Sequence, residues 1–198
     1  NIHELPALVT LAAEMGVDEV MFTNIDYLAG ERCNLLRTFY HESPTPAFRE
    51  SIEEMHRRGK ELGIPVSSYP LKVQEVLVSE ANPPRNVFFA VDGSVAPCVY
   101  LRIPKRGDIP RIFRNEEYLV PQTTFGNVNT EDFLEIWHKD SYRKFRHIYE
   151  ERRKVGHVVS SALQLIANTS FSELKEQMDK GIPPLPEVCQ TCYKAYGI

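Results

Sequence analysis

The sequence predicts an α/β unit over residues 1–80, followed by a small α+β domain with a β-hairpin and helices over residues 81–198. In the first part, apolar residues at helical spacing are twice followed by a glycine and a short apolar run, which is the order of parallel βα units. In the second part this order stops, and a hairpin signal and several helical segments replace it. The break lies at Asn-Pro-Pro-Arg-Asn, residues 82–86, a composition typical of a linker.

The first part contains two βα-like units. Helical periodicity over residues 3–15 and 45–62 predicts two helices. The apolar runs at 17–23 and 64–69 predict two strands, joined to the helices in the order of a parallel sheet. Two units cannot close a barrel, so we expect only the late βα units of a partial βα barrel. The chain begins at Asn1 and not at methionine, and we therefore expect it to be a piece of a longer protein.

The second part begins with a hairpin signal. The runs 87–91 and 94–100 flank Asp92-Gly93, a dipeptide that favours a tight β-turn. Residues 102–124 are punctuated by proline, arginine and glycine, and we expect a long loop there. 

Helical patterns follow this loop. Thr130 is a candidate N-cap of the first helix, whose inward side chains are expected to be Phe133, Ile136 and Trp137. Further helical patterns cover residues 141–154, 158–167 and 171–178.

Three cysteines carry the main chemical signal. Cys189 and Cys192 form a C-x-x-C pair in a proline-flanked loop, and Cys98 follows Pro97 at the end of the hairpin signal. Three thiolates suit a 4Fe-4S cluster, or a zinc site with three thiolate ligands. Two other interpretations stay open: Cys98 as an ordinary buried thiol, and the pair as a redox dithiol. The dithiol is disfavoured because the pair does not begin a helix after a strand.

Polar residues at the ends of the predicted strands are secondary candidates. The loop after the first strand lies on the catalytic face of a parallel barrel, so Cys33 is a possible fourth ligand. Asn24 and Asp26 lie just beyond the end of the same strand and are candidates to line a cofactor or substrate cavity. Residues 67–69, Ser-Ser-Tyr, end the second predicted strand and are weaker candidates to line the same cavity. The alternative for the polar side chains is helix capping and loop hydrogen bonding.

These motifs together resemble the C-terminal SPASM or twitch domain of radical S-adenosylmethionine enzymes. The Gly93-x4-Cys98 spacing matches the Gly-x4-Cys element of that family, and the N-terminal residues resemble a late βα unit of the radical S-adenosylmethionine barrel. The resemblance rests on four segments, which are Val91–Cys98, Phe125–Val128, Phe133–Trp137 and Pro186–Cys192.

The resemblance implies a partial barrel followed by an auxiliary iron–sulfur domain. In such enzymes a cluster in the barrel cleaves S-adenosylmethionine to a radical that abstracts hydrogen from a substrate, and the auxiliary cluster handles electrons or substrate. It further implies an electron donor such as a flavodoxin or ferredoxin. The implied substrate is a peptide or a small molecule, and no residue of the chain indicates which of the two it is.

The sequence departs from the family pattern in three places. The C-x-x-x-C-x-x-C motif of the catalytic cluster is absent from these 198 residues, so this chain by itself is not expected to cleave S-adenosylmethionine. The family cysteine upstream of Gly-x4-Cys has no counterpart at 77–83, and no cysteine follows Cys192. In two-cluster members the Gly-x4-Cys cysteine and the C-x-x-C pair bind different clusters. A single site shared by Cys98, Cys189 and Cys192 is therefore our own inference.

The composition argues against nucleic-acid-binding, membrane-binding and disulfide-rich secreted proteins. The formal net charge is −4, which gives no indication of a nucleic-acid or anionic-membrane partner. Four unevenly spaced cysteines do not suggest a disulfide framework, and no signal peptide is evident, so we expect a cytoplasmic protein with reduced thiols. A non-catalytic domain with structural zinc on the same cysteines remains the alternative function.

Overall fold

The computed structural model describes residues 1–43, 45–165 and 181–198, with residues 157–165 described by their backbone alone. Its longer helices are α1 (Leu5–Glu14), α2 (Glu31–Leu35), α3 (Pro46–Leu62), α4 (Phe133–His138) and α5 (Asp140–Leu165). The short 3-10 turns are η1 (Ile2–Glu4), η2 (Val99–Leu101), η3 (Glu187–Cys189) and η4 (Tyr193–Tyr196). The strands are β1 (Val20–Phe22), β2 (Val66–Ser68), β3 (Phe88–Phe89), β4 (Ser94–Ala96), β5 (Ile109–Phe113), β6 (Glu116–Val120) and β7 (Gly126–Asn127). The chain is thus a mixed α/β structure.

The N-terminal unit is a two-stranded parallel sheet packed against α1 and α3. Strands β1 and β2 pair in parallel with Val20 opposite Val66, which confirms the predicted parallel pairing. Val9 of α1 and Met55 of α3 are fully buried where the two helices meet. The predicted strands shorten to three residues each. The connection between β1 and α3 contains α2, a one-turn helix that the sequence pattern did not indicate.

The hairpin around Asp92-Gly93 is confirmed and is part of a larger sheet. Strands β3 and β4 pair antiparallel, and β7 pairs with the other edge of β4. Gly93 has φ +82°, and a Cβ there would lie 2.4 Å from the Asn129 side chain, so the turn requires glycine. The Asp92 carboxylate accepts hydrogen bonds from the backbone N–H of Ser94 at 3.1 Å and from its hydroxyl at 2.6 Å. These bonds, followed by the pairing with Arg102, lower the pKa of Asp92 to about 2.

The expectation of a long loop over residues 102–124 was wrong. This segment contains the antiparallel hairpin of β5 and β6, in a register with Arg111 opposite Tyr118. Its turn is formed by Arg114 and Asn115, which both have positive φ, +54° and +68°. Such turns usually contain Asn-Gly or Asp-Gly. Because this turn has the sequence Arg-Asn, the sequence pattern did not indicate it.

Two details of the helical region also differ from the prediction. Asp132, and not Thr130, caps α4: its carboxylate accepts the backbone N–H of Leu134 at 2.8 Å, whereas the Thr130 hydroxyl donates to the Asn127 carbonyl. Helix α5 continues through the predicted break at residues 155–157. Gly156 fits the helix there because a Cβ would meet Leu77 at 2.1 Å. The predicted helix over 171–178 and the end of that over 158–167 lie outside the described residues.

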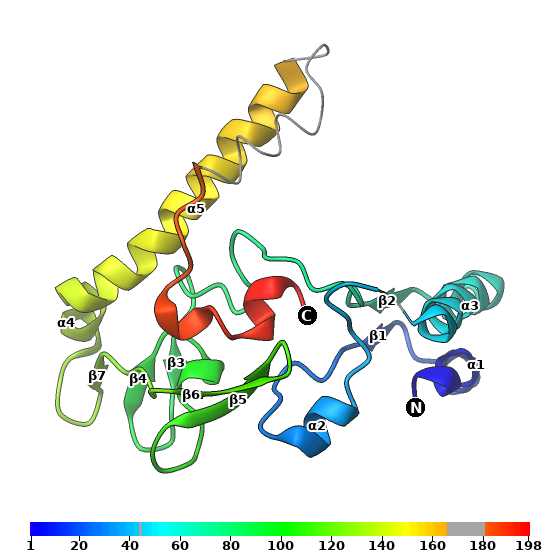
Figure 1. The fold of residues 1–198 in the computed structure, drawn as a ribbon, viewed down its shortest axis with the longest axis horizontal. Helices are drawn as coiled ribbons and strands as arrows, with labels where there is room; N and C mark the ends of the chain where they lie inside the picture. The colour runs from blue at the N-terminus through cyan, green and yellow to red at the C-terminus, as the bar shows by residue number, and fades with distance from the viewer. Residues whose placement is uncertain (44, 166–180) are drawn as a thin grey trace.

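The C-terminal segment lies between the N-terminal unit and the hairpins, with α5 extending away from the body (Figure 1). Its backbone pairs with the segment after β2 through bonds from Gln74 to Tyr196 and from Val76 to Ala195, each 3.0 Å. Arg152 of α5 is 1% exposed and fastens both segments, donating to the carbonyls of Leu77 and Pro183. The C-terminus is therefore an integral part of the core.

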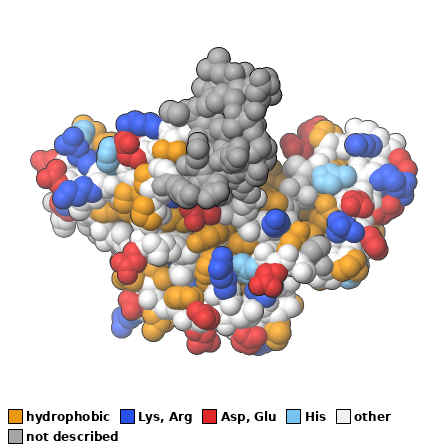
Figure 2. All heavy atoms as spheres, turned by 45° about the horizontal axis from the view of Figure 1, so that its top comes forward, with side chains coloured by type: hydrophobic (Ala, Val, Ile, Leu, Met, Phe, Trp, Pro, Cys, Tyr) orange, Lys and Arg blue, Asp and Glu red, His pale blue; other side chains and the backbone are white. Residues whose placement is uncertain are grey.

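The surface carries charges of both signs. Lysine, arginine, aspartate and glutamate side chains are interspersed over the face shown in Figure 2. None of the helices in the described part of the chain is long and apolar enough to span a bilayer.

Candidate metal centre

The sheet of β3, β4 and β7 fixes the position of Cys98. Central strand β4 is held on both sides, and Val95 and Ala96 are fully buried. Pro97 and Cys98 follow at once, and the chain then turns into η2. The Cys98 side chain is thus presented at the end of a rigid strand, as the hairpin signal predicted.

Two short 3-10 turns hold the C-x-x-C pair. Cys189 ends η3, where its N–H donates to the Pro186 carbonyl at 2.7 Å. The Cys192 N–H then donates to the Cys189 carbonyl at 3.1 Å, which closes a tight turn. Both cysteines are buried, at 6% and 9% exposure. Buried thiols on a hydrogen-bonded turn are preorganised ligands.

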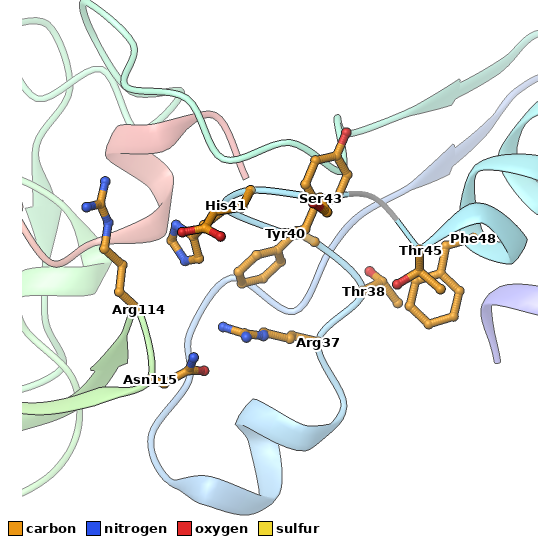
Figure 3. A pocket seen from close by; sticks show the side chains of 11 residues that line it. Arg37, Thr38, Tyr40, His41, Ser43, Thr45, Phe48, Arg114 and Asn115 are labelled. Atoms are coloured by element: carbon orange, nitrogen blue, oxygen red, sulfur yellow. The ribbon is translucent and has the colours of Figure 1, made fainter.

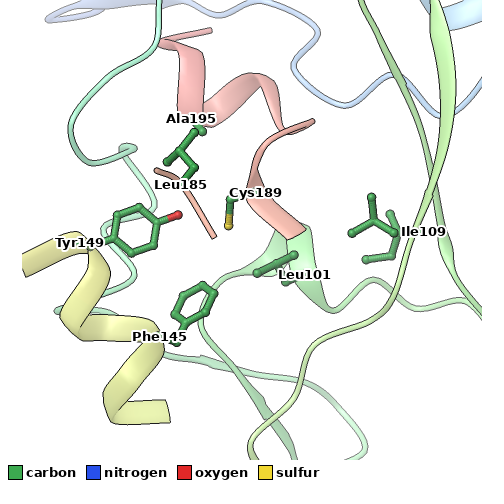
Figure 4. Close-up of a cluster of buried hydrophobic side chains, with 8 residues drawn as sticks. Leu101, Ile109, Phe145, Tyr149, Leu185, Cys189 and Ala195 are labelled. Atoms are coloured by element: carbon green, nitrogen blue, oxygen red, sulfur yellow. The ribbon is translucent and has the colours of Figure 1, made fainter. Parts of the chain in front are cut away.

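The three predicted cysteines line one pocket. Cys98, Cys189 and Cys192 share it with side chains from the linker segment, η2, β5, α5 and η4, although they are far apart in the sequence. Figure 4 shows Cys189 facing Tyr149 of α5 and surrounded by Leu101, Phe145 and Ala195. The structure therefore brings together the residues that the sequence grouped only by inference.

Burial keeps these thiols protonated when no metal is bound. It raises the pKa of both Cys98 and Cys189 to about 12, and the proximity of Cys192 contributes to both shifts. Burial likewise raises the pKa of Cys192. The mutual effect of the three sulfurs is a further sign of their closeness. A redox dithiol needs a depressed pKa and access, so these values argue against that alternative.

Arg111 is a buried cation beside the thiols, and the sequence analysis missed it. Its guanidinium is 4% exposed and donates to the carbonyls of Val188 at 2.9 Å and Tyr100 at 2.5 Å. Within the described residues it forms no ion pair with a carboxylate. Its charge opposes the burial effect on the pKa of all three cysteines. A buried guanidinium without a carboxylate partner suits a site that becomes anionic.

Hydrogen-bond donors point at each sulfur. The nearby backbone N–H groups of Tyr100 and Leu101 favour the thiolate of Cys98, and those of Lys194 and Ala195 favour the thiolate of Cys192. The Tyr149 hydroxyl donates to the Cys189 sulfur, which lowers the pKa of Cys189 against the larger effect of burial. Such donors stabilise thiolates and set the potential of iron–sulfur clusters. They arise from turns and long-range packing, which no local sequence signal revealed.

Of the secondary candidates, Asp26 lies beside the centre. Its carboxylate accepts a hydrogen bond from the Tyr100 hydroxyl at 2.7 Å and pairs with the Lys194 ammonium at 3.0 Å. Tyr100 and Lys194 both line the cysteine pocket. Asp26 thus connects the N-terminal unit to the thiol site through two side chains.

The other candidates lie elsewhere. Asn24 donates to the Pro70 carbonyl at 3.0 Å and accepts from Thr38 at 3.1 Å. Cys33 lies on α2 against the cluster around Leu28 and Phe39, and does not line the pocket of the other three cysteines. Its role as a fourth ligand stays a prediction without support from its position.

Residues 67–69 turn toward local partners. The Ser68 hydroxyl is 3.3 Å from His56 Nε2, and the Tyr69 hydroxyl donates to the Glu80 carboxylate. Ser67 Oγ is buried and finds no hydrogen-bond partner among residues 1–43, 45–165 and 181–198. These contacts match the loop-bonding interpretation for Ser68 and Tyr69 and give Ser67 no assigned role.

Three thiolates suit a cluster or a zinc ion, and the pocket between them is narrow. Among the described residues, no three His, Cys, Asp or Glu side chains are arranged to hold one metal ion. A zinc ion with bonds of about 2.3 Å to sulfur draws its thiolates close together, whereas a cluster spaces them more widely. The cavity between the cysteines has a volume of about 10 Å³, which is room for about one water. The walls would have to move apart to admit a cluster.

Comparison with known proteins assigns a family to this region. Residues 82–155 match a family model described as SPASM, an iron–sulfur cluster-binding domain. This part of the chain is therefore similar to an iron–sulfur cluster-binding SPASM domain, and its mixed α/β structure is compatible with that match. The match contains Cys98 and Arg111 but ends before the C-x-x-C pair. No curated protein and no solved structure matches the chain.

Proposed function

We propose that this chain is the C-terminal part of a radical S-adenosylmethionine enzyme, in which Cys98, Cys189 and Cys192 hold one auxiliary 4Fe-4S cluster. One observation carries the proposal: the cysteine of the SPASM match and both cysteines of the C-x-x-C pair line one buried pocket. Three protein thiolates leave one iron open for an external ligand or a fourth residue. When bound, such a cluster supplies one-electron chemistry or a binding site for substrate.

The protein groups around the thiols support this role. Arg111 and the ammonium of Lys194 provide positive charge beside an anionic centre, and nearby backbone N–H groups together with the Tyr149 hydroxyl favour the thiolates. Positive charge and such donors favour the reduced, more negative state. The proposed partners are an electron donor such as a flavodoxin or ferredoxin, and a peptide or small-molecule substrate.

The N-terminal unit fits the same proposal as the last part of a catalytic barrel. Its two parallel strands and covering helices have βα order, and Asp26, in the segment that follows β1, contacts the cysteine pocket through Tyr100 and Lys194. Radical generation itself requires a cluster motif that these 198 residues lack. The proposed role of the chain is therefore auxiliary.

Anaerobic reconstitution with iron and sulfide tests the proposal. We expect about four irons and four sulfides per chain, lost in the Cys98→Ser, Cys189→Ser and Cys192→Ser variants and retained in Cys33→Ser. Zinc is measured in the same samples. Bound zinc without iron would favour the structural-zinc alternative, and no metal in any form would overturn both.

A further inference from the structure

A second pocket lies beside the Tyr193 hydroxyl, which contacts two of its lining residues, His41 and Arg114. It has a volume of about 600 Å³, within the usual range for small-molecule sites. One wall is the segment after α2, with Arg37 and His41, and another is the turn of the β5–β6 hairpin, with Arg114 and Asn115. In Figure 3 the Arg37 and Asn115 side chains point toward one another below the rings of Tyr40 and His41.

The two arginines supply charge that the protein does not neutralise. Neither Arg37 nor Arg114 forms an ion pair among the described residues. The Nη1 atom of Arg37 is buried and has no hydrogen-bond partner in the part of the chain that the structure describes. A buried donor of a charged group left unpaired is costly, so an acceptor oxygen at this point would stabilise the site.

The turn that carries Arg114 is held in an unusual conformation. Both of its central residues adopt the left-handed region, which is unfavourable for non-glycine side chains. The Arg114 N–H donates to the Tyr193 hydroxyl at 3.1 Å, and that hydroxyl also lies 3.2 Å from His41 Nε2. The three residues therefore lock the hairpin tip to the opposite wall.

The net charge of the lining indicates the kind of anion. Arg37 and Arg114 contribute two positive charges, and the exposed Glu42 contributes one negative charge. Burial, followed by Arg114 and Arg37, lowers the pKa of His41, so that its ring is neutral at pH 7. One excess positive charge matches a monoanion better than a phosphate dianion. Phe39 and Phe48 provide apolar surface beside these groups.

We propose that this pocket binds the carboxylate of a small acidic ligand, such as an amino acid derivative or a peptide C-terminus, through Arg37 and Arg114. Binding uses only side chains of the described residues and does not require a metal centre. Two lining residues, His41 and Arg114, contact the hydroxyl of Tyr193, which directly follows Cys192 in the sequence.

Nuclear magnetic resonance titration of the ¹⁵N-labelled chain tests this proposal. The probes are N-acetyl-phenylalanine, its neutral carboxamide and inorganic phosphate, each to about 20 mM, a range that detects millimolar affinity. We expect saturable shifts at Arg37, Arg114 and Asn115 with the acid, and at least about tenfold weaker binding of the carboxamide and of phosphate.

Variants separate binding from folding. Arg37→Gln and Arg114→Gln should each weaken binding of the acid at least about tenfold, while Arg49→Gln, an exposed change on α3, should not. Arg37→Lys retains the positive charge and should weaken binding of the acid less than Arg37→Gln does. The spectrum of each free variant reports whether it folds. Equal binding of acid and carboxamide, tighter binding of phosphate, or no saturable shift in the folded wild-type chain would each overturn the proposal.

Discussion

At the scale of single residues, the chemistry of the thiol centre depends on burial opposed by a few directed groups. Desolvation favours the neutral thiols, while Arg111, the backbone N–H groups and Tyr149 favour the thiolates. Without metal, burial prevails and the protons stay on sulfur. Metal binding must therefore release protons, so that affinity increases with pH.

The same shifts predict alkaline instability of the metal-free chain. The pKa of Cys98 and Cys189 rises from 9.0 to about 12 on folding. Below pH 8 both states keep these protons, so the thiols do not affect the pH dependence. Between pH 9 and 12 mainly the unfolded state loses them, and stability falls as pH rises. We expect the pair to contribute a loss of about 2–3 kcal/mol between pH 8 and pH 10.

Urea unfolding at pH 8 and pH 10, under reducing and metal-free conditions, measures this loss. The double variant Cys98→Ala with Cys189→Ala should show a much smaller difference between the two pH values, although its stability is lower at both. Cys33→Ala should retain the full difference. An unchanged difference in the double variant would contradict the assigned protonation of these thiols.

At the scale of elements, close backbone approaches hold the short strands in place. Strand β7 has only two residues, and Gly126 within it faces α4. A Cβ at Gly126 would lie 2.7 Å from Ile136 Cγ1 and 2.7 Å from Glu131 Oε1. Ile136 is fully buried, so it has little freedom to move. The contact between β7 and α4 thus depends on glycine.

Gly126→Ala should therefore destabilise the chain by about 1–3 kcal/mol through overpacking of Ile136. Gly30→Ala is the matched control, because a Cβ at Gly30 meets nothing within 4 Å and its backbone is extended. The control should change the free energy of unfolding by less than about 0.5 kcal/mol. Equal effects of the two substitutions would show that the close approach at Gly126 does not contribute to the free energy of unfolding.

At the scale of the whole molecule, the thiol site exists because the chain ends fold onto one core. The C-terminal segment pairs with residues 74–76 and is fastened to α5 through Arg152, which brings the C-x-x-C pair beside the strand that carries Cys98. Asp26 adds a contact from the N-terminal unit. The site is assembled from segments that no single local motif contains.

Local signals explain which parts could be predicted from the sequence. Apolar periodicity and glycines at helix ends predicted α1 and α3, and Asp92-Gly93 predicted the first hairpin. The second hairpin was not predicted because its turn consists of Arg114 and Asn115 and contains no glycine.

The candidate site divides in the same way. The C-x-x-C and Gly-x4-Cys spacings predicted its three cysteines, and from these cysteines we inferred a single shared site. Arg111 and Tyr149 reach it only through tertiary packing, from β5 and α5. Because nothing in the neighbouring sequence distinguishes them from ordinary core residues, the structure was needed to identify them.

The central claim is that the three cysteines share one cluster, and electron paramagnetic resonance tests it most directly. After anaerobic reconstitution and dithionite reduction, we expect about one unpaired spin per chain with the signal of a 4Fe-4S cluster. The signal should disappear in Cys98→Ser, Cys189→Ser and Cys192→Ser alike and persist in Cys33→Ser. A full signal in Cys98→Ser, with loss only in the C-x-x-C variants, would contradict a shared site.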